Sequence, residues 1–552
     1  QDTALTKGAT TARGGTTYGD RGHPPGRKGS GAWITFDPAK TPAVTMRVGI
    51  SYVGLANARA NLAAEMGKGA TLETVRDAAR KAWNTRLGEI AVEGGTKDER
   101  AVFYTALYHV LLGENTYSDV NGDYLGFDKK VHKVAAPQQV QYANFSGWDV
   151  YRSQLQLVTW LDPRIGSDIA QSLLNQANQN GGVWDRWTHV TGATSVMNGD
   201  PSPPSIAAIH AFGGRGFDLK GAYASLLKGA TVPTALDLDH RGCPVQCVGE
   251  RPGLDQWLKL HYMPTNAPGW GSAADTLELA AADFGVAQLA EDVGDGANAK
   301  LFRARAGWWR NLFNPATGYI QPRNADGSWK PVDFNLENDD DYVEGSGAQY
   351  LWMVPFDPAG LFAALGGTEK AQARMDRFFY NPDGRLAVTK SGYDHAELDN
   401  EPSIASPWLY DFAGTPWKTQ EIVRAAMKRI WIDAPNGISG NDDLGEMSSW
   451  YVWAALGMYP LYPGRAEMVL GSSLFERAVV DRPGGRVTID AQGAEMDAPY
   501  IASMSVNGAA NTKPWLPAAF ARSGGTLRYT LSKTPDKNWG ASPSDAPPSF
   551  GP

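Results

Sequence analysis

The sequence has few cysteines, few histidines and no excess of positive charge. Two of its 552 residues are cysteines, and its eight histidines include no H-E-x-x-H pair. This content disfavours a zinc site, which needs clustered cysteine and histidine ligands. With 51 basic and 59 acidic residues the formal net charge is −8, so neither nucleic acid nor a membrane surface is expected as a partner.

Long apolar runs and a leader sequence are also missing. No stretch of about 18 apolar residues occurs, so the sequence predicts no transmembrane helix. The chain begins at Gln1 without a visible signal peptide, and we expect a leader to have been removed. Cys243 and Cys247 can form a tight local disulfide, and the lack of other thiols favours export. We therefore expect a secreted or cell-surface protein that is exported by a bacterial-type pathway.

Aromatic residues are abundant instead. The chain has 19 Trp and 21 Tyr, which is many for its length. Two interpretations stay open at this point. The rings can build large buried cores, or they can line a cleft in which the apolar faces of sugar rings stack on indoles.

Hydrophobic periodicity divides the chain into three regions. In the first region, residues 1–55, residues 1–30 read as a Gly- and Thr-rich loop or tail without regular structure. Segments 32–38 and 43–53 then read as strands, either the end of a sheet whose beginning is missing or a small hairpin. Residues 56–462 place apolar residues at helical spacing, and residues 463–552 read as short alternating strands. We predict a mainly α fold: an (α/α)6 toroid with a small C-terminal β-domain.

Loops just before predicted helices concentrate acidic, amide and aromatic residues. These loops are residues 144–152, 338–352, 398–410 and 437–451. Glycoside hydrolysis needs one carboxylic acid to protonate the leaving oxygen and a second carboxyl group to activate water or attack the sugar. Acidic residues in such places usually cap helices, but several such loops on one helical scaffold favour an active site.

Three carboxylates suit these roles. Glu344, with Gly345 and aromatic neighbours beside it, can occupy a partly dehydrated setting that keeps the acid protonated. Asp443 or Asp442, at a polar loop that opens a helix, would be kept ionised by backbone N–H groups. The oxygen ligands of these loops suit calcium, although residues 338–342 lack the EF-hand spacing and read as a solvated acidic loop.

In these motifs the sequence resembles glycoside hydrolase family 92, the inverting, calcium-dependent exo-α-mannosidases. The matching segments include NFSGWDVYR, DYVEGSGAQYLWMVPFD and NGISGNDDLGEMSSWYVWAALGMYPLYPG, and the similarity extends roughly from residue 46 to residue 540. The resemblance implies an N-terminal β-sandwich, of which residues 1–55 would hold remnant strands. Residues 56–462 would be the catalytic domain and 463–552 the C-terminal β-domain. The rest of the sandwich could be a separate fragment.

The resemblance also implies residue roles. Glu344 in YVEG would be the general acid and Asp443 in GNDD the general base, with Asn441 and Asp442 orienting the water. The remaining positions would hold the terminal mannose or border the Ca²⁺ ion that binds its 2- and 3-hydroxyls. Substrate binding falls to Trp148, Asp149, Glu401 and Asn441, and metal binding to Asn400 and Glu401.

The chain departs from the family pattern at three motifs. Ile404 and Ala405 stand where two histidines are usual, Asp200 and Pro201 replace Tyr and His, and Glu446 replaces Gln. The predicted acid and base are kept, so we expect hydrolysis of terminal α-mannose from glycans. Linkage specificity stays open.

Other functions also stay open. One alternative is a hydrolase that uncaps mannosyl phosphates, against which Glu344 argues because phosphate leaves without an acid. A second is a catalytically silent mannose-binding protein on the same fold, which the changed motifs would suit. A third is an (α/α)6 enzyme of another chemistry, such as a polysaccharide lyase.

Overall fold

The computed structural model describes most of the chain in two compact units, residues 1–69 and 70–552. The described residues are 10–13, 30–33, 37–40, 42–336, 340–389 and 392–552. The boundaries predicted at residues 55 and 462 stay predictions, since the units follow compactness and not function.

Among its described residues, the first unit holds one hairpin and one helix. Strands β1 (Thr10–Arg13) and β2 (Ser30–Trp33) pair antiparallel, and α1 (Leu55–Glu65) follows. The expectation of a structureless tail up to residue 30 is therefore wrong at β1. The hairpin alternative agrees with this pairing, while residues 34–36 of the first predicted strand lie outside the described residues.

The second predicted strand, residues 43–53, is not a strand. Its alternating side chains Val44, Met46 and Ile50 are exposed, and the part of the unit that the structure describes places no strand beside it. Asn61 of α1 donates to the Ile50 carbonyl oxygen at 2.8 Å instead. Alternation alone predicted a strand, but a strand also needs a hydrogen-bonded neighbour.

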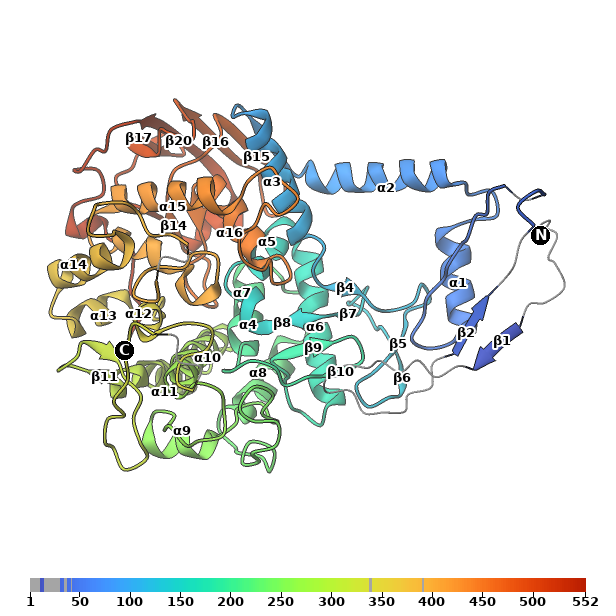
Figure 1. Cartoon of the computed structure of the whole chain (residues 1–552), viewed down its shortest axis with the longest axis horizontal. Helices are drawn as coiled ribbons and strands as arrows, with labels where there is room; N and C mark the ends of the chain where they lie inside the picture. Colours follow the sequence, from blue (N-terminus) through green and yellow to red (C-terminus); the bar gives the residue numbers. More distant parts are fainter. Residues whose placement is uncertain (1–9, 14–29, 34–36, 41, 337–339, 390–391) are drawn as a thin grey trace. The chain divides into compact units, whose positions relative to one another are not determined.

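Helices dominate the second unit (Figure 1), as predicted. Most are short, and the longest, α10, is buried along nearly its whole length. The α-helices are α2 (Leu72–Leu87), α3 (Lys97–Val110), α4 (Gly147–Val150), α5 (Gln154–Leu161), α6 (Pro163–Gln179), α7 (Ser202–Ala211), α8 (Leu219–Gly229), α9 (Leu254–Leu260), α10 (Ser272–Val293), α11 (Gly296–Ala306), α12 (Gly347–Tyr350), α13 (Pro358–Ala364), α14 (Thr368–Phe379), α15 (Pro416–Ile430), α16 (Glu446–Ala455) and α17 (Ala518–Ser523). The 3-10 helices are η1 (Gly307–Asn311), η2 (Glu401–Ser403), η3 (Ser406–Asp411) and η4 (Pro543–Asp545).

One predicted helix is broken by a side chain from far along the sequence. The segment from Trp148 to Leu161 divides into α4 and α5, because the backbone N–H groups of Ser153 and Gln154 donate to Glu446 Oε2, at 3.0 and 2.8 Å. These two donors are thereby oriented toward α16 rather than toward a preceding turn of helix.

The C-terminal strands form a six-stranded sheet in the order β18-β17-β20-β16-β15-β3, with α15 in contact with β17 (Figure 1). Its edge strand β3 comes from the range predicted to be helical and pairs antiparallel with β15, Ile90 opposite Val480. Hydrophobic periodicity could not reveal this strand, since four residues are too few to establish a period. The strands are β3 (Ile90–Glu93), β15 (Arg477–Val480), β16 (Val487–Gln492), β17 (Tyr500–Val506), β18 (Ala509–Ala510) and β20 (Gly525–Ser532).

Short two- and three-stranded sheets lie in the segments between the helices. They are β4 (Asn115–Thr116) with β7 (Tyr142–Ala143), β5 (Asp123–Leu125) with β6 (Val131–Lys133), β8 (Phe145–Ser146) with β9 (Trp187–His189) and β10 (Gly192–Ala193), β11 (Phe313–Asn314) with β12 (Tyr319–Ile320), and β13 (Met458–Tyr459) with β14 (Met468–Leu470) and β19 (Trp515–Leu516).

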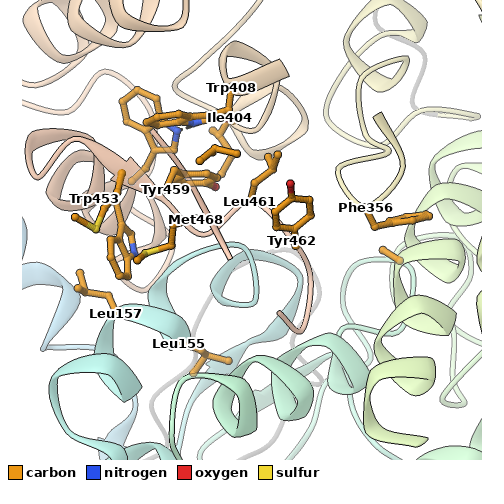
Figure 2. Packing of buried hydrophobic residues seen from close by; sticks show 14 of the residues in the cluster. Leu155, Leu157, Phe356, Ile404, Trp408, Trp453, Tyr459, Leu461, Tyr462 and Met468 are labelled. Carbon is orange, nitrogen blue, oxygen red and sulfur yellow. Dashed lines mark hydrogen bonds between the residues drawn. The ribbon is translucent and has the colours of Figure 1, made fainter. Parts of the chain in front are cut away.

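Helices and sheet share one hydrophobic core. Figure 2 shows part of it, where Trp408 of η3 stacks on Tyr459 of β13 with ring centroids 5.0 Å apart. At least nine of the 19 Trp side chains are fully buried, so much of the aromatic content builds this core. Full burial of one large apolar side chain contributes about 1.5–3 kcal/mol to stability.

Two further expectations concern single features. Cys243 and Cys247 are joined as a disulfide. Over the described residues, none of the helices combines the length and apolar character needed to cross a bilayer.

Candidate active site

Three carboxylates from three distant loops meet at one point. Asp149 lies on α4, Glu401 on η2, and Asp443 in the loop before α16. One oxygen of each lies within 4.8 Å of the others, and Asp149 and Glu401 are each 1% exposed. We call Asp149, Glu401 and Asp443 the acidic cluster.

Burial and mutual repulsion make the charged form of this cluster costly. Burial raises the pKa of Asp149 well above its usual range, and the charge of Asp443 raises it further. Burial and the charge of Asp149 do the same to the pKa of Glu401. The pKa of Asp443 is also raised, chiefly by burial, so the prediction that backbone N–H groups keep this carboxyl group ionised is wrong. Carboxylates this close can share the site only if a proton or a cation lies between them.

Arg152 supplies part of the missing positive charge. Its guanidinium is 2.7 Å from Glu278 Oε1 and lies 4.8 Å from the ring centre of Trp148. It lowers the pKa values of Asp149 and Glu401, although less than burial raises them. Arg152 was not predicted from the sequence, although its place at the end of GWDVYR was an available signal. Glu278, which lies on a long buried helix without a motif, was not predicted either.

Glu344 lies near this cluster but is exposed, so the partly dehydrated setting predicted for the acid is wrong. Its negative charge contributes to the raised pKa of Asp149, so the two carboxylates are electrostatic neighbours. Asn400 donates from Nδ2 to the backbone oxygen of Glu344 at 3.0 Å, which ties the loop before η2 to the loop before α12. Asn400 therefore has a positioning contact here.

The backbone is strained where the predicted acid and base lie. Glu344 has φ 53°, and Asp443, Leu444 and Gly445 have φ 47°, 54° and 87° in succession. A non-glycine residue in this left-handed region costs about 1–3 kcal/mol. Such strain persists only where the surrounding structure imposes it, and it is concentrated at functional sites.

The other predicted residues have distinct surroundings. Asp442 Oδ1 accepts from the Ser448 N–H at 2.9 Å, and Oδ2 lies 3.1 Å from His109 Nδ1, so this side chain ties α16 to α3. Asn441 is exposed at the opening of the same loop. Trp148 is 1% exposed, and its Nε1 has no hydrogen-bond partner among the described residues.

The acidic cluster suits a hard divalent cation. In the described part of the chain, no donor reaches either carboxylate oxygen of Glu401 or Asp149 Oδ2, although all three atoms are buried. Buried oxygens without donors are costly, and a cation would satisfy them. Three carboxylates are the ligand type that Ca²⁺ prefers. Of the two metal residues predicted, Glu401 belongs to the cluster, whereas the Asp149 and Asp443 carboxylates were not predicted as ligands.

Behind the cluster, Glu446 ties α16 to α5. Its Oε1 accepts from the Ser153 hydroxyl at 2.6 Å, in addition to the two backbone bonds to Oε2. Burial raises its pKa from 4.5 to about 8. Ionisation of Glu446 therefore opposes folding. The stability that the protonated side chain contributes is fully present below about pH 4.5 and is lost as the pH rises through about 8.

We predict that Glu446→Gln flattens the pH dependence of stability. The neutral amide cannot ionise, so the variant should match the wild type at pH 5 and melt a few degrees higher at pH 9. Melting temperatures measured across this range test the expectation. The difference between the two curves isolates Glu446 from the other buried carboxyl groups, so parallel curves would show that this side chain is already ionised at pH 5.

The chain matches the family model of the glycosyl hydrolase family 92 catalytic domain over residues 57–533. The chain belongs to this family. The α-mannosidase BT3965 of Bacteroides thetaiotaomicron is 27% identical with a TM-score of 0.82, and covers 90% of this chain and 64% of its own. The family's inverting mannosidase BT2199 from the same organism is 29% identical with a TM-score of 0.81, over 91% of this chain and 68% of its own.

A sequence relative gives the same picture. An uncharacterized secreted glycosidase of Arthroderma benhamiae is 26% identical over 563 residues, which is 95% of this chain and 65% of the relative. The chain thus spans 64% of the length of the α-mannosidase BT3965 and 65% of that of the glycosidase. The fold class predicted from the sequence, a mainly α toroid with a β-domain, is confirmed by the similarity to the two mannosidase structures.

Proposed function

We propose that this protein is a calcium-assisted exo-α-mannosidase that removes terminal mannose from glycans with inversion. The acidic cluster with Glu344 beside it carries the proposal, because glycoside hydrolysis needs two carboxyl groups at one sugar site and Glu344 is an electrostatic neighbour of the cluster. Its two structural relatives are an α-mannosidase and an inverting mannosidase, which supports the substrate and the stereochemistry.

Asp443 acts as the general base and Glu344 as the general acid. Asp443 takes a proton from the water that attacks the anomeric carbon. Glu344 gives its proton to the glycosidic oxygen, which leaves as a hydroxyl. In inverting enzymes such carboxyl groups are about 6.5–9.5 Å apart, which leaves room for the water. Asp442, tied to His109 and Ser448, holds the loop of the base in place.

Asp149, Glu401 and Asp443 would hold the calcium ion, and Trp148 and Asn441 would complete the pocket of the mannose ring. When bound, the ion supplies positive charge for the sugar hydroxyls and for the developing transition state. The buried Arg152–Glu278 pair fixes the orientation of α4 and hence of Asp149. The presence of an acid at Glu344 favours ordinary glycosides over mannosyl phosphates.

Secretion also belongs to the proposal. The relative from Arthroderma benhamiae is a secreted glycosidase, and a disulfide between Cys243 and Cys247 is stable in oxidising surroundings. Mannose-containing glycans outside the cell are the expected substrates.

Product analysis tests the activity directly. The full chain with Ca²⁺ is incubated with α-1,2-, α-1,3- and α-1,6-linked mannobiose and with a mannosyl phosphate, and proton NMR follows the anomers. The β-anomer of mannose should appear first with at least one mannobiose. A first product in the α-form would contradict inversion, and binding without release of mannose would favour the silent lectin-like alternative.

We predict that Glu344→Gln separates substrates by their leaving groups. The amide cannot donate the required proton, so kcat/KM for mannobiose should fall by about 10²–10³-fold. An aryl mannoside with an activated phenol needs little protonation and should lose less than about 10-fold. Glu369→Gln, an exposed change on α14, serves as the matched control and should leave both rates unchanged. Equal losses on both substrates would remove Glu344 from the role of acid.

A further inference from the structure

A second pocket lies beside the loop that carries Glu344. Its volume is about 380 Å³, which is within the range of small-molecule sites. Tyr319 of β12, Arg374 and Arg377 of α14, Trp352, Asn335 and Asp394 line it. None of these residues belongs to the acidic cluster or to the predicted site.

Arg374 is held rigidly in this pocket. The Tyr319 ring stacks on Phe334 with centroids 4.0 Å apart and 5° between the planes. The guanidinium carbon of Arg374 lies 3.8 Å from the centre of the Tyr319 ring, so it covers the opposite face. Its Nη1 also donates to the Gly318 carbonyl oxygen at 2.7 Å. A guanidinium has five N–H donors in a fixed fork, and this one is oriented before any ligand binds.

The positive charge of the pocket is only partly compensated. Burial lowers the pKa of Arg374, and the neighbouring charge of Arg377 lowers it further. Arg377 is exposed and makes no ion pair within the described residues. The acidic lining residue Asp394 is half exposed, and its Oδ2 lies 3.8 Å from His395 Nε2. Two guanidinium groups against one carboxylate leave a net charge that an anion would neutralise.

We propose that this pocket binds a sugar that carries an anionic group, a phosphate or a carboxylate. The anion lies between Arg374 and Arg377, where a planar fork can bind two oxygens at once. Asn335 and Asp394 accept hydrogen bonds from ring hydroxyls, and the apolar walls at Trp352 and Phe378 suit the C–H face of the ring.

The pocket is near enough to Glu344 to influence which glycans are cut. Ala348, another lining residue, follows Glu344 by four positions, so their Cα atoms are at most about 14 Å apart. The anionic sugar would then belong to the same glycan as the mannose that is removed. This extension rests on the proposed function, whereas the binding itself does not.

Calorimetry on the full chain tests the binding without using mannose or turnover. Glucose 6-phosphate, glucuronate, glucose and inorganic phosphate are titrated separately. At least one of the two anionic sugars should bind more tightly than both glucose and phosphate, and the comparison between them identifies the preferred anion. Equal affinities for glucose 6-phosphate and phosphate, or no binding of either anionic sugar, would overturn the proposal.

Paired variants assign the binding to this pocket. Arg377→Gln should weaken binding of the preferred anionic sugar about 10-fold. Asp394→Asn should strengthen it, since it removes a negative charge and keeps an acceptor. Arg385→Gln is the matched control: it removes the same charge from an exposed site paired with Asp383 and should change nothing. If Arg377→Gln and Arg385→Gln weakened binding equally, the effect would come from the overall charge of the protein and not from this pocket, and the proposal would be overturned. Failure of mannose release with these results intact would count only against the proposed activity.

Discussion

Treatment of the wild-type protein with EDTA should lower the rate of mannoside hydrolysis by about 10³-fold or more, and added Ca²⁺ should restore it. A metal ion contributes several kcal/mol to a transition state of this kind, and each 1.4 kcal/mol is a factor of ten. The structural reason is the acidic cluster, in which three carboxylates lie within 4.8 Å and burial penalises their charge. Hydrolysis rates at equal pH with chelator, with Ca²⁺ and with Mg²⁺ measure the effect.

A second measurement separates binding of the ion from catalysis. Calcium at 100 times its dissociation constant stabilises the folded state by about 2.7 kcal/mol, and the melting temperature should rise accordingly. Glu401→Gln removes a ligand charge from the cluster and should abolish this rise. Glu476→Gln, an exposed change elsewhere, should keep it. Full activity in EDTA together with an unchanged melting temperature would show that the cluster is held by protons and not by a cation.

The convergence of loops could be predicted from the sequence because it follows from helical periodicity. Acidic and amide residues that precede helices of one ring meet at the same end of that ring. The loops of Glu344, Glu401 and Asp443 can be identified in this way from the sequence alone. Asp149 and Asp443 could not be identified as possible metal ligands, because ligand sets depend on distances of a few ångströms between elements far apart in the chain.

The compensating groups could not be predicted for a related reason. Arg152 and Glu278 lie 126 positions apart, and nothing in either local pattern indicates that they pair. The break between α4 and α5 likewise depends on Glu446, 293 positions beyond Ser153. Strand β3 could not be predicted for the same reason, because its pairing with β15, and not a local alternation of side chains, makes it a strand. Local periodicity specifies elements, whereas long-range hydrogen bonds specify where they end.

Asp443→Asn should be the most damaging single substitution, with kcat reduced by about 10⁴-fold. The amide cannot accept the proton of the attacking water. Loss of the Asp443 carboxylate also removes one negative charge from the acidic cluster. Water must be activated whatever the leaving group is. The loss should therefore be equally large for mannobiose and for an activated aryl mannoside, in contrast to the divided effect expected of Glu344→Gln.

Asp442→Asn is the matched neighbour for this experiment. Its carboxylate accepts from the Ser448 N–H and faces His109. The amide oxygen of Asn can still accept from Ser448, so the substitution should lower stability by less than about 1 kcal/mol and reduce kcat only about 10-fold. Steady-state rates and melting temperatures of both variants decide between the two aspartates. If Asp442→Asn lost as much activity as Asp443→Asn while keeping its stability, the base would be Asp442, and the strained backbone at Asp443 and Leu444 would serve to orient the neighbouring carboxylate instead.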